Sequence, residues 1–117
     1  MTDSVTVYHN PRCSKSRQTL GLLEGEGVNP TIINYLETPP DAATLTHLLN
    51  MLGLEPRELM RKGEAEYTDL NLANPELSRE QLIQAMVANP RLIERPIVVA
   101  NGKAMIGRPP AKVLEIL

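Results

Sequence analysis

The strongest local constraint on the fold is the dipeptide Asn101-Gly102, which separates two short apolar runs at residues 97–100 and 103–106. Asn and Gly both tolerate the positive φ angles that a two-residue type I′ turn requires. The pattern therefore predicts a β-hairpin, and any sheet that contains it is at least partly antiparallel.

The N-terminal third predicts a strand, a loop, a helix and a second strand. Residues 4–8 read as a strand with Val5 and Val7 on one face. Residues 9–12 read as a loop because Asn-Pro favours a turn. An apolar side that includes Leu20 and Leu23 predicts a helix over 14–26. Residues 31–36 are rich in Ile and Tyr and predict the second strand.

The middle of the chain reads as helical. A start signal at 38–41 is followed by leucines at helical spacing, and residues 55–93 read as short helices interrupted by Gly63 and two Asn-Pro pairs. Ser78 and Gln81 have the spacing of a capping box. A last helix is expected from Pro109-Pro110 to residue 116. The order β-α-β-(helices)-β-β-α predicts an α/β fold, a mixed sheet flanked by helices.

Thioredoxin-like folds share this order. The expected organisation is one domain over residues 1–117, with a helical insertion between the two halves at about 41–93.

Composition and charge narrow the function classes. The chain has 12 basic and 14 acidic residues, a net charge of −2, no Phe or Trp and three Tyr. It lacks the basic field and the aromatic platforms typical of nucleic-acid binding, so we expect no nucleic-acid partner and no membrane partner. One cysteine, no signal-peptide pattern and no apolar run of membrane-spanning length favour a cytoplasmic location.

The main candidate functional residue is Cys13, at the predicted start of the first helix. Unpaired N–H groups and the helix dipole lower a thiol pKa at such a position. Arg12, Lys15 and Arg17 surround it, and His9 lies four residues upstream, where it could add positive charge or shuttle a proton. Most lone cysteines are small buried hydrophobes, but these flanking charges favour a reactive thiolate.

Cys13 and Ser16 form a C-x-x-S pattern with no second cysteine in the chain. A redox cycle would therefore need an external thiol. A tyrosine-phosphatase-type loop would need Arg six positions after the cysteine. Thr19 occupies that position, so this class of enzyme is rejected. No metal site is expected, because His9 and Cys13 are the only soft ligands near each other.

Three distant arginines, Arg61, Arg95 and Arg108, are candidate oxyanion ligands, since the planar guanidinium group suits tetrahedral anions. Each taken alone reads more simply as a solvated surface charge. The Arg95-Pro96 bond is a candidate cis peptide.

These features together resemble the glutaredoxin-dependent arsenate reductase (ArsC) family over essentially the whole chain. The similar segments are Tyr8-His9-Asn10-Pro11-x-Cys13-x-x-Ser16-Arg17, Tyr35-Leu36-Glu37, Leu59-Met60-Arg61-Lys62, Arg95-Pro96-Ile97-Val98-Val99 and Arg108-Pro109. The resemblance implies a thioredoxin-like fold with a helical insert and a role in arsenical resistance.

The resemblance also implies residue roles. Cys13 would be the nucleophile and His9 would lower its pKa. Arg61, Arg95 and Arg108 would bind arsenate or a similar oxyanion, and Pro96 would be cis. Asn10, Ser16 and Arg17 would support the loop. No cofactor would be bound; glutathione would be the co-substrate and glutaredoxin the protein partner.

Around the cysteine the chain departs from the best-known arsenate reductases, with Arg12, Ser14 and Lys15 where those proteins have Ala, Gly and Thr. These replacements are similar to those of a subgroup of short ArsC-like proteins. Two alternatives stay open. One is an Spx-like transcriptional regulator that binds RNA polymerase, against which Ser16 in place of a second cysteine argues. The other is a general glutathione-linked thiol oxidoreductase.

Overall fold

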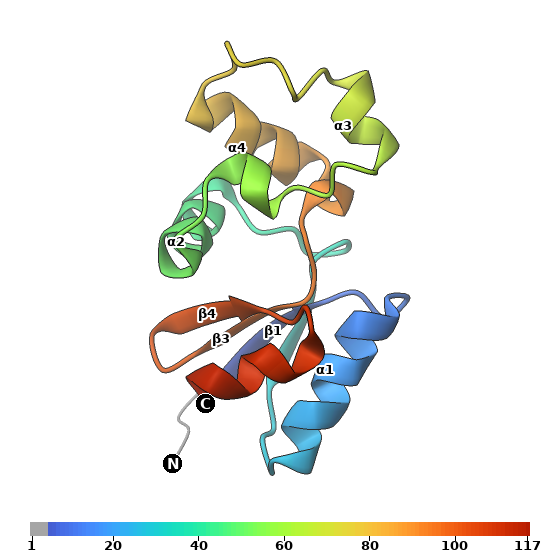
Figure 1. The fold of residues 1–117 in the computed structure, drawn as a ribbon, viewed down its shortest axis with the longest axis vertical. Helices are drawn as coiled ribbons and strands as arrows, with labels where there is room; N and C mark the ends of the chain where they lie inside the picture. Colours follow the sequence, from blue (N-terminus) through green and yellow to red (C-terminus); the bar gives the residue numbers. More distant parts are fainter. Residues whose placement is uncertain (1–4) are drawn as a thin grey trace. The chain divides into compact units, whose positions relative to one another are not determined.

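The computed structural model describes residues 5–117 (Figure 1). Its strands are β1 Val5–His9, β2 Thr31–Asn34, β3 Ile97–Ala100 and β4 Lys103–Ile106. Its α-helices are α1 Ser14–Gly25, α2 Ala42–Leu52, α3 Ala65–Asp69 and α4 Arg79–Ala88, and its 3₁₀ helices are η1 Pro56–Leu59, η2 Pro90–Leu92 and η3 Pro110–Ile116. None of the described helices is long and apolar enough to cross a membrane.

The four strands form one mixed sheet in the order β2-β1-β3-β4. β1 is parallel to β2 and antiparallel to β3, and β4 pairs antiparallel with β3. Asn101 and Gly102 have φ angles of 55° and 73°, as a type I′ turn requires. The predicted hairpin and the predicted α/β class with a mixed sheet are both confirmed.

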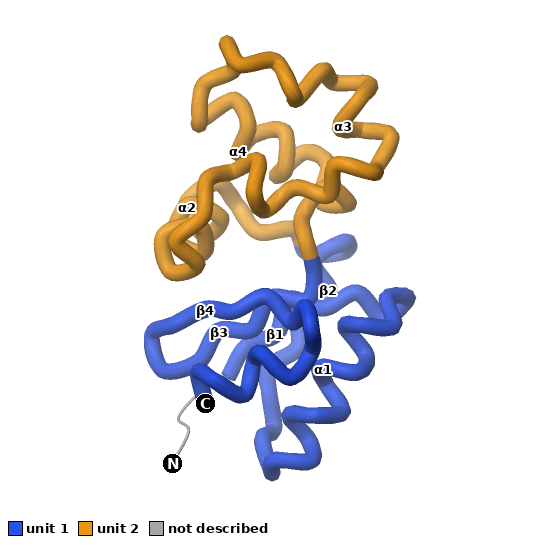
Figure 2. The backbone as a smooth tube through the Cα atoms, in the orientation of Figure 1, with its two compact units in different colours: residues 1–38, 95–117 blue, residues 39–94 orange. Residues whose placement is uncertain are grey.

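The described residues divide into two compact units (Figure 2). The first contains residues 5–38 and 95–117 and holds the whole sheet with α1 and η3. The second contains residues 39–94 and is helical apart from a single bridge between Met60 and Ile93. The expected insertion at 41–93 falls within this second unit.

Aliphatic side chains build the core of the first unit, because the chain has no Phe or Trp. α1 and η3 pack on the sheet and on each other. The buried cluster contains Val5, Val7, Leu23, Val98, Ala100, Val113 and Ile116. Burying one of the larger aliphatic side chains stabilises the folded state by roughly 1.5–3 kcal/mol. This core fixes the strands whose ends carry the candidate site.

The second unit is organised by helix caps and a leucine-rich interior. The Asp41 carboxylate accepts the N–H of Thr44 at 2.7 Å and starts α2. Ser78 and Gln81 form the predicted capping box, with reciprocal hydrogen bonds of 3.2 and 2.8 Å at the start of α4. The faces of α2 and α4 that carry buried residues supply Leu45, Leu48, Leu49, Leu82, Ile83 and Met86.

Some predicted boundaries were wrong. His9, expected in the loop, is the last residue of β1, because its backbone pairs with Asn34 of β2. β2 ends at Asn34 and not at Leu36, because the Asn34 carboxamide oxygen accepts the N–H of Leu36 at 3.2 Å and turns the chain. The last helix is a 3₁₀ helix. Ser4, expected to open the first strand, lies outside the described residues.

Candidate active site around Cys13

The sheet topology brings four chain segments to one edge. β1 and β2 are parallel and end side by side at His9 and Asn34. β3 runs the opposite way, so its first residue, Ile97, pairs with Tyr8 near the end of β1. β4 turns back again, and its last residue, Ile106, pairs with Ile97. The last residues of β1, β2 and β4 and the first residue of β3 therefore lie along the same edge of the sheet.

The residues at this edge are the candidate site. The loop after β1 leads to Cys13, Tyr35 directly follows β2, Arg95 stands two residues before β3, and Arg108 two residues after β4. Every strand thus places one polar or reactive side chain at the same edge. Backbone geometry, and not sequence proximity, brings together residues up to 95 positions apart.

Asn10 organises the loop that carries Cys13. Its backbone carbonyl accepts the N–H of Cys13, and its side-chain oxygen accepts the N–H of Arg12, both at 3.0 Å. Its own N–H donates to the Ser16 hydroxyl at 3.1 Å, and Asn10 is buried. Arg17 adds an exposed contact of 3.3 Å to the Pro11 carbonyl. These bonds hold the loop against the first turn of α1.

Cys13 is the residue that precedes α1, with an extended backbone, and its side chain is partly exposed. Burial raises the pKa of the thiol, but the N–H of Ser16, the guanidinium of Arg95 and the N–H of Lys15 lower it by more. The net effect is a pKa below the ordinary value, so the thiolate fraction is larger than that of a free cysteine. A partly exposed thiolate can act as a nucleophile.

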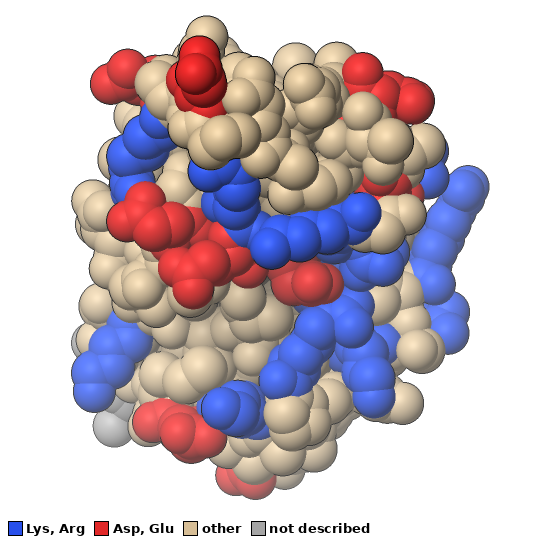
Figure 3. All heavy atoms as spheres, turned by 45° about the horizontal axis from the view of Figure 1, so that its top comes forward, with Lys and Arg blue, Asp and Glu red and all other residues tan. Residues whose placement is uncertain are grey.

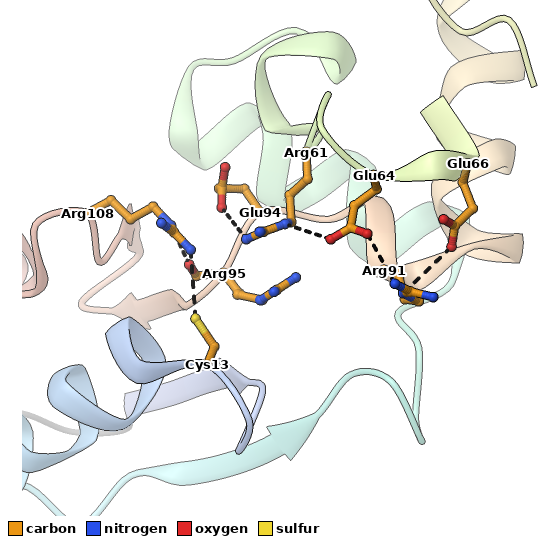
Figure 4. A network of polar contacts seen from close by, with 8 residues as sticks. All are labelled: Cys13, Arg61, Glu64, Glu66, Arg91, Glu94, Arg95 and Arg108. Carbon is orange, nitrogen blue, oxygen red and sulfur yellow. Dashed lines mark hydrogen bonds and ion pairs between the residues drawn. The ribbon is translucent and has the colours of Figure 1, made fainter. Parts of the chain in front are cut away.

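The guanidinium group of Arg108 reaches the sulfur (Figure 4). Nη2 of Arg108 lies 3.7 Å from Sγ of Cys13, and Nε of Arg108 donates to the backbone carbonyl of Arg95 at 2.9 Å. The side chain of Arg95 also hydrogen-bonds the sulfur. The Arg95-Pro96 bond is cis, as expected, and the Arg108-Pro109 bond is cis as well, which the sequence did not predict.

Tyr35 supports Arg95 and was missed in the sequence. Its side chain is buried, with 1% exposed, and its hydroxyl hydrogen-bonds the Arg95 guanidinium. Burial lowers the pKa of Arg95, but Cys13 and Tyr35 raise it by more, so the guanidinium stays charged. The available signal was its place in the segment Tyr35-Leu36-Glu37, one of those that resemble the ArsC family.

Gly107, between β4 and Arg108, was also missed. A Cβ atom built on this glycine would lie 2.5 Å from the Thr19 hydroxyl and 2.8 Å from Cγ of Pro96. Thr19 is fully buried on α1, and the N–H of Gly107 donates to the Pro96 carbonyl at 2.9 Å. The close approach of three segments leaves room only for a hydrogen atom, and it sets where Arg108 begins.

His9 and Ser16 form a buried pair beneath the loop, with Nδ1 of His9 2.6 Å from the Ser16 hydroxyl. Burial and then the charge of Arg17 lower the pKa of His9, so the neutral imidazole is favoured near pH 7. A positive His9 beside the sulfur, one of the two expectations, is therefore disfavoured. The groups that lower the pKa of Cys13 are two backbone N–H groups and Arg95, and His9 contacts Ser16, whose N–H is one of them.

Arg61 belongs to the second unit. Its Nη1 lies 3.2 Å from Glu94 and its Nε 3.4 Å from Glu64, while Glu64 also contacts Arg91 at 3.2 Å (Figure 4). The first unit thus brings Cys13, Arg95 and Arg108 together by itself, and Arg61 is held by carboxylates of its own unit. Across residues 5–117, no group of three or more His, Cys, Asp or Glu residues is arranged to hold a metal ion.

The fold and this site define a class of protein, the thioredoxin-like domains that present a cysteine at the start of the first helix. Comparison with known proteins specifies the family. The model of the ArsC family matches residues 8–116, and the chain belongs to that family.

Individual relatives agree. The Escherichia coli K12 protein YfgD is 65% identical over all of this chain and 99% of its own length. An arsenate reductase of Neisseria meningitidis serogroup A is 46% identical over 97% of both chains. The solved structure of an arsenate reductase from Vibrio cholerae is 56% identical, covers 97% of this chain and 98% of its own, and superposes with a TM-score of 0.96.

Proposed function

We propose that this protein is an arsenate reductase in which Cys13 is the nucleophile. The observation that carries the proposal is the position of one sulfur with a lowered pKa beside two guanidinium groups, those of Arg95 and Arg108. A thiolate that bonds to arsenic must approach an anion, and the adjacent guanidinium groups offset that repulsion. Membership of the ArsC family and relatives named as arsenate reductases support the same substrate.

In the first step the Cys13 thiolate attacks the arsenic of arsenate. A sulfur–arsenic bond forms, an arsenic–oxygen bond breaks, and the oxygen leaves as water after protonation. Arg95 and Arg108 hold the remaining arsenate oxygens and stabilise their charge. Arg61 is a third proposed ligand of the oxyanion, on the basis of the family resemblance.

Glutathione supplies the second thiol, because the chain has no other cysteine. Overall, arsenic acid and two thiols give arsenous acid, one disulfide and one water. As(V) gains the two electrons that the two sulfurs lose. Glutaredoxin returns Cys13 to its reduced form, and a reducing cytoplasm suits this cycle. No bound cofactor is needed.

The remaining predicted site residues hold the nucleophile in place. Asn10 and Arg17 bond to the loop around Cys13, and cis Pro96 follows Arg95. Ser16 links the loop to His9: a neutral His9 with its hydrogen on Nε2 accepts the Ser16 hydroxyl hydrogen while that oxygen accepts the N–H of Asn10. We propose that His9 acts through this link, as a positioning residue.

The test is arsenite production from arsenate with purified protein, glutathione and glutaredoxin. We expect turnover that depends on both reductants and is abolished in Cys13→Ser. Wild-type activity no higher than that of Cys13→Ser would refute the proposal. Faster turnover of glutathionylated substrates than of arsenate would favour a general thiol oxidoreductase instead.

A further inference from the structure

Arg12 differs from every other arginine of this protein. All eight arginines lie in the described part of the chain, and seven have a side-chain hydrogen bond or ion pair. Arg12 is exposed, and among residues 5–117 its side chain has no such contact. An arginine without an internal partner, one residue from a reactive sulfur, is available to an external anion.

Lys15, on the other side of Cys13, shares these properties. It is exposed, and its side chain has no hydrogen bond or ion pair with any described residue. No Asp or Glu occurs between residues 9 and 23, and the first turn of α1 has no acidic residue. Two uncompensated positive charges therefore flank the nucleophile, in a chain whose net charge is −2.

We propose that Arg12 and Lys15 form a docking surface for the carboxylates of the thiol reductant, a small peptide thiol such as glutathione. The inference deepens the proposed function and depends on it for the identity of the reductant. Arg95 and Arg108 contact the sulfur and suit the oxyanion that bonds there. Arg12 and Lys15 are the charges beside the same sulfur whose side chains remain available.

Electrostatics explains why the reductant needs charges of its own. Glutathione carries two carboxylates and one ammonium group, and its reactive thiolate adds a further negative charge. It must approach an arsenate adduct that is also anionic, so the two reactants repel each other. Positive side chains beside the sulfur offset this repulsion and raise the rate at which glutathione encounters the adduct.

The first test compares two reductants in the arsenate assay. In the double variant Arg12→Gln/Lys15→Gln we expect the KM for glutathione to rise on the order of fivefold, the sum of two exposed charge pairs. The KM for arsenate is expected to stay unchanged. With β-mercaptoethanol, a neutral thiol, wild type and variant should turn over equally. Lys103→Gln removes one exposed charge at the start of β4, the opposite end of that strand from Arg108, and should change nothing.

The second test does not require arsenate. Cys13 thiolate attacks a disulfide, forms a mixed disulfide and releases one thiolate, so its rate with glutathione disulfide can be compared with its rate with neutral hydroxyethyl disulfide. We expect the double variant to lower the first rate about fivefold and to leave the second unchanged. The neutral reagent corrects for any change in the thiol pKa.

The outcomes separate the two proposals. Equal effects of the double variant on the charged and neutral reagents would overturn the docking surface, whether or not arsenate is reduced. A selective effect on glutathione disulfide in a protein that does not reduce arsenate would support the docking surface and reject the arsenate reductase.

Discussion

The arginines of the two units are held in different ways. In the second unit Arg61 contacts Glu94 and Glu64, Arg91 contacts Glu64 and Glu66, and their charges are balanced by carboxylates (Figure 4). In the first unit Arg108 donates to a backbone carbonyl, and Arg95 contacts the hydroxyl of Tyr35. These two contacts of the first unit are with neutral groups.

The difference matters for chemistry. A carboxylate fixes a guanidinium and cancels its field, whereas a carbonyl or hydroxyl fixes it and leaves its charge to act on the sulfur. On the face drawn in Figure 3, acidic and basic side chains lie beside one another in several places. The segment around Cys13, with no acidic residue from 9 to 23, departs from this pattern in sequence.

The largest expected effect tests whether the arginine beside the sulfur does the chemistry. Arg95→Lys keeps a positive charge and loses the planar fork beside the sulfur. We expect kcat/KM for arsenate to fall about 100-fold, as for loss of one preorganised donor. Arg91→Lys, in the carboxylate network, should leave kcat/KM within about twofold. Equal losses in the two variants would remove the distinction between the units.

The next prediction concerns packing in the first unit. Gly107→Ala places a Cβ 2.5 Å from the Thr19 hydroxyl, so Thr19, Pro96 or the backbone before Arg108 must shift. We expect a loss of about 2 kcal/mol in the free energy of unfolding, measured by urea denaturation, together with weaker arsenate binding. Gly21→Ala is the control, because its Cβ meets nothing within 4 Å on α1, and it should stabilise the protein slightly. A fully active, stable Gly107→Ala protein would show that this contact does not place Arg108.

The next prediction concerns the stability that the ion pairs of the second unit contribute. Glu64 is half-buried and contacts both Arg61 and Arg91, so Glu64→Gln should cost about 1 kcal/mol of unfolding free energy, less at high salt. Glu66, whose one ion pair among residues 5–117 is 3.8 Å long, is the matched control, and Glu66→Gln should cost less. Identical unfolding curves for wild type and Glu64→Gln would mean that the network adds no stability.

The smallest effect is expected for Tyr35. Tyr35→Phe removes the hydroxyl that contacts Arg95 and keeps the buried ring. We expect the KM for arsenate to rise about threefold and the pKa of Cys13 to rise slightly, because Arg95 becomes less well oriented. Tyr67→Phe in α3 should change neither quantity. An unchanged thiol pKa in Tyr35→Phe would limit Tyr35 to a packing role.

Local signals in the sequence were sufficient for the elements that depend on local physics. Asn101-Gly102 predicted its turn, Ser78 and Gln81 predicted their capping box, and the position of Cys13 before α1 predicted a lowered thiol pKa. Each depends on a few neighbouring residues. Residue type made Arg61, Arg95 and Arg108 candidate oxyanion ligands, and the family resemblance added the arsenate-binding role.

What the sequence did not predict depends on distant contacts. Tyr35 and Arg95 are 60 positions apart in sequence and meet only because β2 and β3 flank β1. Gly107 is restricted by Thr19 of α1 and by Pro96, which no local pattern reveals. His9 was expected in a loop, and its pairing with β2 is what buries it and disfavours its charge.

The most direct test of the account is the pH dependence of Cys13 alkylation by iodoacetamide. Only the thiolate reacts, and the N–H groups of Ser16 and Lys15 and the guanidinium of Arg95 lower its pKa. The rate should therefore reach half its maximum below the free-thiol value of about 8.5. A midpoint at or above about 8.5 would contradict the claim that this site holds the sulfur ionised for attack.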